Sequence, residues 1–131
     1  MKGFKGNIEQ LTLDDDNFRK VLYIGTNLQL VLMSLEAGEE IGSETHVNND
    51  QFFRFESDEG KCIIDNNEYH VTKGDAIVVP AGAKHNVIKI GTTVLKMYTI
   101  YGPQNHKDGI LRKIKKDAER KDEVFDGKTS E

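Results

Sequence analysis

Short runs of β-branched, aromatic and alternating residues, separated by turn residues, fill the chain from Val21 to Tyr101. Glycine, asparagine, aspartate and proline, which favour tight turns, dominate the segments between the runs. Many short strands at close spacing are typical of an antiparallel sandwich or barrel, and no sustained helical period of apolar residues interrupts them. The sequence therefore predicts an all-β fold with strands at 21–24, 28–35, 51–56, 62–64, 69–71, 76–79, 87–88 and 93–101.

A different composition begins after Pro103. The chain has 131 residues, the length of one domain, and we expect a single domain (1–131) with a barrel core at about 20–101 and a charged tail at 103–131. Within the tail, segment 115–125 is rich in Lys, Ala, Glu and Arg, which favour a helix. Because this segment has few apolar residues, a short helix packed on the barrel and a disordered tail both fit the pattern.

Charge and cysteine content exclude several classes of function. Lys and Arg number 18 against 22 Asp and Glu, which gives a net charge of −4, so we expect no nucleic-acid partner. The single cysteine excludes an intramolecular disulfide and fits a reducing compartment. The N-terminus lacks the apolar segment of a signal peptide, and no apolar run reaches the roughly 20 residues of a membrane helix. We therefore expect a cytoplasmic protein with no membrane partner.

Three segments bring metal-ligating side chains together. Glu44 and His46 are two residues apart in an extended segment, so their side chains point to the same face. Gln51 starts the next run, and the turn residues before it can return its side chain to that face; Asp50 is the rival ligand one residue earlier. His85 opens a strand directly after a Pro-x-Gly turn. Histidine is the commonest metal-binding side chain, so these residues indicate a candidate metal site.

The spacing of these segments resembles the two sequence motifs of the cupin superfamily. The first motif falls on Gly38, Glu44, His46, Gln51 and Asp58, and the second on Gly74, Pro80, Gly82, His85 and Lys89. The family usually has His, Glu, Gly and Asn where this chain has Glu44, Gln51, Asp58 and Lys89. The resemblance implies a small antiparallel β-barrel or jelly roll that binds one divalent metal ion through Glu44, His46, Gln51 and His85. Glu44 and Gln51 together leave the total charge of the four ligands at −1, the same as for the three His and one Glu that the family usually has.

The types of the candidate ligands indicate which metals could bind, and the alternation of side chains along the strands indicates which residues line a pocket. Two imidazoles, a carboxylate and an amide oxygen suit Mn, Fe, Co, Ni or Zn. The phase of Gln51, His85 and Met97 predicts a small-molecule pocket at the barrel mouth, with Lys96 facing water. Its predicted lining is Phe53, Phe55, Val87, Met97, Thr99 and Tyr101.

Three other reactive side chains have ordinary explanations. His70 lies in a strand and is predicted to be exposed, and Cys62 is predicted to be a packed, inert thiol. His106 fits a surface turn; the alternative is a tail that folds over the pocket and supplies an acid–base group.

Three functions from different classes fit a metal site of this kind. The first is an enzyme acting by isomerase-like Lewis-acid chemistry on a small hydroxy-carbonyl compound such as a sugar or keto acid. The second is a metal-dependent dioxygenase, and the third is a non-catalytic module that binds a small molecule or stores metal. Neither a glycine-rich phosphate loop nor an arginine cluster is visible in the sequence. The resemblance also implies a homodimer, in which Phe52 would pack beneath the partner's sheet.

Overall fold

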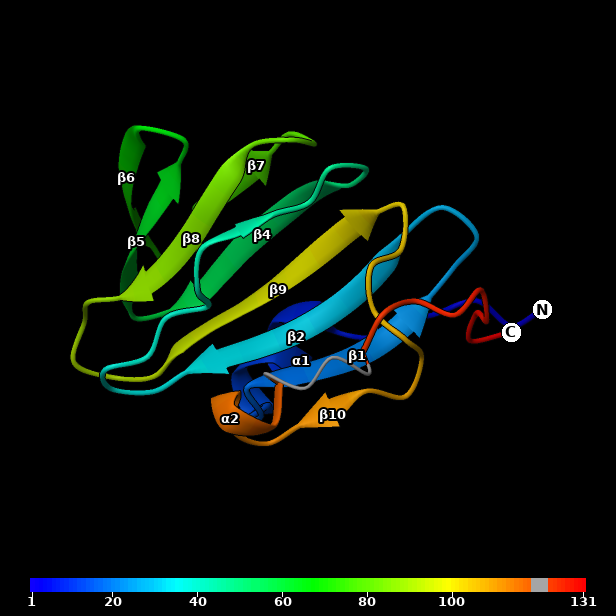
Figure 1. Cartoon of the computed structure of the whole chain (residues 1–131). Helices are drawn as coiled ribbons and strands as arrows, with labels where there is room; N and C mark the ends of the chain where they lie inside the picture. The colour runs from blue at the N-terminus through cyan, green and yellow to red at the C-terminus, as the bar shows by residue number, and fades with distance from the viewer. Residues whose placement is uncertain (119–122) are drawn as a thin grey trace.

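Two antiparallel sheets make up most of the structure, a computed structural model that describes residues 1–118 and 123–131 (Figure 1). Between β3 and β9 the chain passes repeatedly from one sheet to the other, which gives a jelly-roll fold. The six-stranded sheet has the order β10 (Leu111–Arg112), β1 (Arg19–Ile24), β2 (Gln29–Leu35), β9 (Leu95–Gly102), β4 (Asp50–Ser57), β7 (Ala76–Val79). The four-stranded sheet has the order β3 (Glu44–Thr45), β8 (Lys84–Lys89), β5 (Glu59–Ile64), β6 (Asn67–Thr72).

The predicted strands agree with the observed ones. Each predicted run falls within a strand or overlaps one, and the all-β prediction is confirmed. The short strands β3 and β10 were not predicted, because two residues carry no periodic pattern. Strand β1 begins at Arg19, two residues before its predicted start, and Arg19 shares the buried phase of Val21.

The hydrophobic core lies between the two sheets. Along β9 every second side chain, from Leu95 to Tyr101, is almost fully buried, as strand alternation requires. The prediction that Lys96 faces water is wrong, since its Nζ donates to the carbonyl of Asp15 and to Oδ1 of Asp16 at 2.8 Å. The short connection before β1 thus covers this lysine, and the Met97 phase nevertheless faces inward.

One helix lies outside the predicted elements. Helix α1 (Ile8–Asp14) packs on β9 and β4 and is capped by Asn7, whose Oδ1 accepts a hydrogen bond from the Gln10 amide at 3.0 Å. Asn7 followed by an acidic first turn was the available signal in the sequence. No helix in the described part of the chain is long and apolar enough to span a membrane.

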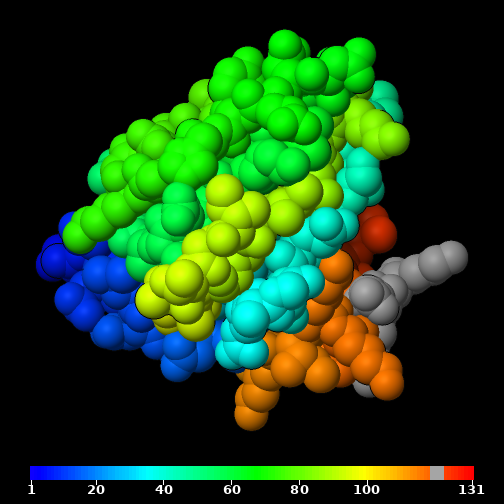
Figure 2. All heavy atoms as spheres, turned by 90° about the vertical axis from the view of Figure 1, so that its left-hand side faces the viewer, coloured from blue at the N-terminus to red at the C-terminus, as the bar shows by residue number. Residues whose placement is uncertain are grey.

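The C-terminal segment packs on the two-sheet body. Its helix α2 (Lys115–Ala118) lies beside the segment that precedes β3. Figure 2 shows that segment in cyan and the helix in orange. The predicted helix over 115–125 is corrected at its end, because Val124 forms an extended bridge with His106; residues 119–122 lie outside the described residues. Ile110 and Glu123 are buried, so the described parts of this segment are packed rather than loose.

Two departures from the cupin motifs contact one another. Asp58 Oδ2 lies 3.4 Å from Lys89 Nζ, and both side chains are only 5 % exposed. Asp58 Oδ1 also accepts hydrogen bonds from the amide and hydroxyl of Thr93, at 3.1 Å each. A Cβ at residue 91 would lie 2.0 Å from the same carboxylate, so glycine is required there. The aspartate and lysine together join the β4–β5 turn to the β8–β9 connection.

We expect Asp58→Asn to lower the free energy of unfolding by about 1.5–3 kcal/mol at pH 7, because hydrogen bonds to a charged group are lost. Asparagine tolerates the positive φ of 65° at this position, so the backbone should be retained. Burial raises the pKa of Asp58, but hydrogen bonds from Thr93, Glu59 and Lys89 outweigh it and the net pKa is lowered. The carboxylate therefore stabilises the fold above its unfolded pKa of 3.8, and this contribution is lost as the pH falls further.

Urea unfolding of both proteins from pH 7 to pH 3 measures this effect. The difference between them should shrink below about pH 4. Lys61→Met is the control, because the ion pair between Lys61 and Glu68 is exposed and long at 3.9 Å. A pH-independent difference between the wild type and Asp58→Asn would contradict the role given to the charge.

Candidate metal centre

Three predicted ligands meet where β3 faces β8. Glu44 and His85 are direct partners across these antiparallel strands, and His46 follows β3. The ligand atoms of these three residues all lie within 4.8 Å of one another. Glu44 Oε2 lies 3.1 Å from His46 Nε2. One carboxylate and two imidazoles therefore converge as the motif spacing predicts.

Two buried acceptor atoms at this place have no hydrogen-bond partner among the described residues. The Nδ1 atom of His85 faces the Ala83 carbonyl at 3.3 Å, and its Nε2 atom is buried without a partner. Gln51 donates from Nε2 to Thr99 Oγ1 at 2.9 Å, and its Oε1 atom is likewise left without a partner. Buried acceptors without partners are rare and cost about 1–3 kcal/mol each. A cation that accepted both lone pairs would remove this cost, so the donor set fits a divalent metal ion.

Gln51 belongs to the same interior face as the histidines. Its side chain is 2 % exposed and lies beside Tyr101, whose ring stands edge-on to His46 with centroids 5.4 Å apart. Phe53, in phase with Gln51 on β4, contacts the His85 ring at a centroid distance of 6.3 Å. The Gln51 side chain therefore lies beside residues that surround the three clustered ligands.

The local electrostatics favour the ligand protonation states that a metal needs. Burial raises the pKa of Glu44, but the hydrogen bond and charge of His46, together with Arg19 and His85, outweigh it, and the net pKa is lowered. Burial lowers the pKa of His85. At neutral pH Glu44 is therefore a carboxylate and His85 a neutral imidazole, as metal coordination requires.

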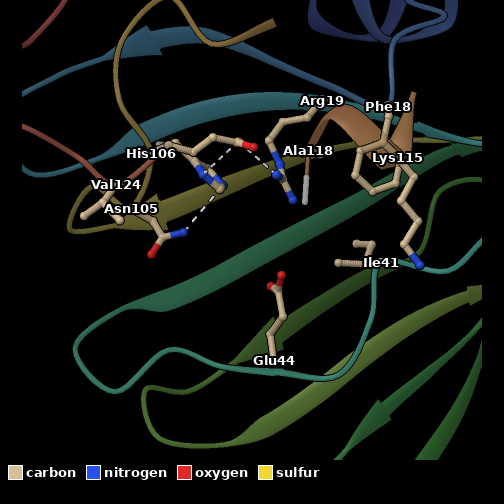
Figure 3. A pocket seen from close by; sticks show the side chains of 10 residues that line it. Phe18, Arg19, Ile41, Glu44, Asn105, His106, Lys115, Ala118 and Val124 are labelled. Carbon is tan, nitrogen blue, oxygen red and sulfur yellow. Dashed lines mark hydrogen bonds and ion pairs between the residues drawn. The ribbon is translucent and has the colours of Figure 1, made fainter. Parts of the chain in front are cut away.

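A cavity of about 500 Å³ opens beside Glu44. Figure 3 shows the Glu44 carboxylate pointing from one side toward Arg19 and His106 on the other. The volume suits a small organic molecule. Among the described residues, the lining is Phe18, Arg19, Ile41, Glu44, Asn105, His106, Lys115, Ala118, Glu123 and Val124.

The predicted pocket residues lie elsewhere. Phe53, Phe55, Val87 and Met97 belong to the hydrophobic core, and none of the six predicted lining residues borders the cavity. Thr99 and Tyr101, the other two, contact Gln51 instead. The strand phase identified side chains that point inward, but these side chains fill the core, and the cavity beside Glu44 lies where the C-terminal segment meets the sheets.

His106 forms part of the cavity wall, so its placement in a surface turn is wrong. It is 7 % exposed, and its Nε2 atom lies 3.2 Å from the Tyr101 hydroxyl. Burial, with the charge of Arg19 and the proximity of His46, lowers its pKa to about 3, so the ring is neutral at pH 7. The position of His106 instead matches the alternative prediction, in which the C-terminal tail folds over the pocket.

A buried ionic network closes the cavity behind His106. Arg19 Nη1 donates to Glu123 Oε1 at 2.9 Å, and both side chains are less than 10 % exposed. The same carboxylate lies 3.5 Å from Arg112 Nε and 3.7 Å from His106 Nδ1. Sequence reasoning missed Arg19 and Glu123. The available signal was that Arg19 falls in the buried phase of β1 once the strand is extended by two residues.

The remaining candidates stand apart from this centre. Asp50 is exposed and accepts a hydrogen bond from the Ala81 amide at 2.8 Å, outside the three-residue cluster. His70 is exposed on β6 and pairs with Glu59 at 2.6 Å, as its ordinary explanation predicts. Cys62 is buried, and burial raises the pKa of its thiol to about 12, so it is an inert core residue.

Comparisons with known proteins agree with the motifs and the fold. The Cupin domain family model matches residues 31–101. The protein YrkC of Bacillus subtilis is 44 % identical over 123 residues, which cover 89 % of this chain and 66 % of YrkC. The protein L612 of Acanthamoeba polyphaga mimivirus is 38 % identical over 107 residues, covering 79 % of this chain and 67 % of L612. The chain thus spans about two thirds of the length of these relatives.

A solved structure extends the agreement over most of the fold. The crystal structure of BH2720 from Bacillus halodurans superposes with a TM-score of 0.88 at 37 % identity and covers 89 % of this chain and 93 % of that one. The jelly roll, the two motifs and these relatives lead to the same conclusion: the chain belongs to the cupin superfamily.

Proposed function

We propose that this protein is a divalent-metal enzyme that acts on a small polar hydroxy-carbonyl compound. One observation carries the proposal: two buried acceptors that have no partner among the described residues, His85 Nε2 and Gln51 Oε1, accompany the Glu44–His46 pair. The neighbouring cavity, of which Glu44 forms one wall, supplies room for a substrate.

The residues that would hold the metal are Glu44, His46, His85 and Gln51. Nitrogen and oxygen ligands without thiolate suit Mn, Fe, Co, Ni or Zn. When bound, such an ion supplies Lewis-acid polarisation of a carbonyl oxygen, which suits isomerase-like chemistry.

The chain's own residues bind and orient the substrate. Asn105 offers amide hydrogen bonds to hydroxyl groups in the cavity, and the neutral His106 ring forms part of the wall without adding charge. Burial raises the pKa of Tyr101, so its hydroxyl keeps its proton and donates toward His106 Nε2. Phe18 and Ile41 supply apolar walls that exclude water from the reacting carbon. These groups together favour a compact molecule with adjacent hydroxyl and carbonyl groups.

Deuterium exchange tests the proposed chemistry. Metal-loaded protein is incubated without oxygen in D₂O with dihydroxyacetone, glyceraldehyde, erythrulose and pyruvate, and the C–H positions are followed by NMR. We expect incorporation beside the carbonyl of at least one compound, and none with the metal-free protein. Full metal loading with no incorporation into any compound would contradict the isomerase-like proposal.

A second candidate function is a dioxygenase. Two histidines and one carboxylate within 4.8 Å of one another form the donor set that Fe(II) oxygenases use. Oxygen uptake by the Fe(II)-loaded protein with diketones and catechols separates this function from isomerisation. Binding of metal and ligand with neither uptake nor exchange would instead favour the non-catalytic module.

The Gln51 amide is predicted to contribute directly to metal affinity. We expect Gln51→Leu to weaken divalent-metal binding by about 10- to 100-fold, because the buried Oε1 acceptor is removed. Isothermal titration with zinc measures the effect. Thr99→Val is the matched control, since it removes only the 2.9 Å hydrogen bond that orients the amide. If Gln51→Leu binds zinc as tightly as Thr99→Val, the amide oxygen is not a ligand.

We also propose a homodimer that pairs through the outer face of the six-stranded sheet. Val78, Phe52, Ile100 and Leu30 are neighbours across β7, β4, β9 and β2 and form an apolar row, in which Val78 is 63 % exposed. Sedimentation should find a dimer that Phe52→Glu converts to a monomer, whereas Tyr69→Glu, on the other sheet, leaves it intact. A monomeric wild type would contradict this arrangement. Cytoplasmic location and the absence of nucleic-acid and membrane partners stay predictions of the sequence.

A further inference from the structure

The cavity carries cationic groups whose position is not explained by the metal centre. We infer that its ligand carries an anionic group, a carboxylate or a phosphate, which Arg19 and Lys115 bind while the hydroxy-carbonyl end faces Glu44. This inference rests on the proposed function and specifies its substrate class. It therefore narrows the substrate from hydroxy-carbonyl compounds in general to their acids and phosphate esters.

Arg19 is a buried cation that lines the cavity. It is 6 % exposed, its guanidinium carbon lies 5.4 Å from the centroid of the Phe18 ring, and Nη1 is held by Glu123. Figure 3 shows its guanidinium end directed into the cavity, opposite Glu44. The ion pair therefore fixes the guanidinium without using all five of its N–H donors. A rigid guanidinium with unused donors is well suited to an oxyanion.

Lys115 adds a second positive charge to the same wall. It is partly buried at the start of α2 and has no ion pair among residues 1–118 and 123–131. Among the described lining residues, Arg19 and Lys115 balance the two carboxylates, Glu44 and Glu123. A divalent ion held by Glu44 would leave two positive charges in excess. A neutral sugar would leave them uncompensated, whereas a small anion would neutralise them in part.

The geometry separates the two ends of such a ligand. Figure 3 shows Glu44 on one side of the cavity and Arg19 on the opposite side, with Lys115 along the edge. A volume of about 500 Å³ accommodates a hydroxy acid or its phosphate counterpart. An oxyanion at Arg19 would therefore orient the neighbouring hydroxyl and carbonyl groups toward the metal ligands.

Paired probes test this inference without an activity assay. Lactate is compared with neutral lactamide, and glycerol 3-phosphate with glycerol, by calorimetry on metal-free and zinc-loaded protein. We expect the anion of at least one pair to bind about tenfold more tightly than its neutral counterpart. A stronger preference in the first pair assigns a carboxylate, and in the second pair a phosphate. The ¹⁵Nε signal of Arg19 should shift with the anion in both forms of the protein.

A bound zinc ion would attract an anion even without the cavity residues. Variants of Arg19 and Lys115 therefore measure how much of the anion affinity comes from the cavity. Lys115→Met should weaken anion binding about threefold to tenfold, while Lys116→Met, its exposed neighbour, should not. Arg19→Lys keeps the charge beside Glu123 but loses the planar donor set, and about a tenfold loss is expected. Lys115→Met keeps the test valid if the Arg19 variant folds poorly.

Two results overturn the inference: equal affinity for anion and neutral counterpart in both pairs, or anion affinity unchanged in both cavity variants. Either result leaves zinc binding, and with it the proposed metal centre, intact. A third result separates the two proposals. If the protein does not bind zinc but still prefers the anion, and Lys115→Met still loses that preference, the proposed function is wrong and the anion site stands.

Discussion

Replacing His85 by leucine is expected to weaken divalent-metal binding by more than about 100-fold. Loss of a group that merely supports a ligand already costs 10- to 100-fold, so loss of the ligand itself should cost more. The Nε2 atom of His85 is one of the two buried acceptors without a partner among the described residues. Leucine has a comparable volume and removes this atom, so the metal-free fold should be retained.

Calorimetry measures the zinc affinity of both proteins, and thermal unfolding with and without zinc measures how much the bound ion stabilises each fold. Zinc at 100 times its dissociation constant should stabilise the wild type by about 2.7 kcal/mol and His85→Leu by almost nothing. The control is His70→Leu, because His70 is exposed on β6 and pairs only with Glu59 among the described residues. Zinc stabilisation of His85→Leu equal to that of the wild type would contradict the assignment of the ligand.

The largest loss of stability is expected from Glu123→Gln. The Glu123 carboxylate lies between Arg19 and Arg112 and close to His106, and its side chain is 8 % exposed. Removal of its charge would leave the Arg19 guanidinium without its ion-pair partner at a mostly buried site. Breaking one side of a buried ion pair typically costs 3–5 kcal/mol. We therefore expect a loss of about 3 kcal/mol and faster proteolysis of the C-terminal segment.

Urea unfolding and limited trypsin digestion check this prediction. Glu9→Gln is the control, because the ion pair between Glu9 and Lys73 is exposed and its N–O distance is 3.7 Å. This substitution should change the free energy of unfolding by less than about 0.5 kcal/mol. Arg19→Met combined with Glu123→Gln should lose less than the sum of the two single variants. A stability loss for Glu123→Gln as small as that of Glu9→Gln would show that the network does not hold the segment.

The strands were predictable because alternation and turn residues are local signals. Run 93–101 alternates and run 28–35 is almost continuously apolar, and the observed bounds of both strands lie within two residues of the prediction. Helix α1 was missed because the apolar period of seven residues is too short to be distinctive. Strand β10 pairs through only two residues, and its position depends on packing far away in the sequence.

The candidate ligands were predictable because the cupin motifs place them at fixed spacing. The cavity was not, since its wall combines Arg19, from the first strand, with His106 and Glu123, from the tail. Those residues come together through ion pairs and hydrogen bonds that no local pattern encodes. The inward phase of Met97 was inferred from an exposed Lys96, yet both side chains are buried, because the α1–β1 connection covers the lysine.

The most direct test of the metal centre is anomalous diffraction from crystals of the zinc-loaded protein, recorded on both sides of the zinc edge. We predict one anomalous peak per chain, bonded at about 2.0–2.2 Å to Glu44, His46 and His85. Gln51 Oε1 should face the same ion. Zinc bound only at other residues, or no anomalous peak despite excess zinc, would contradict the metal centre on which the proposed function depends.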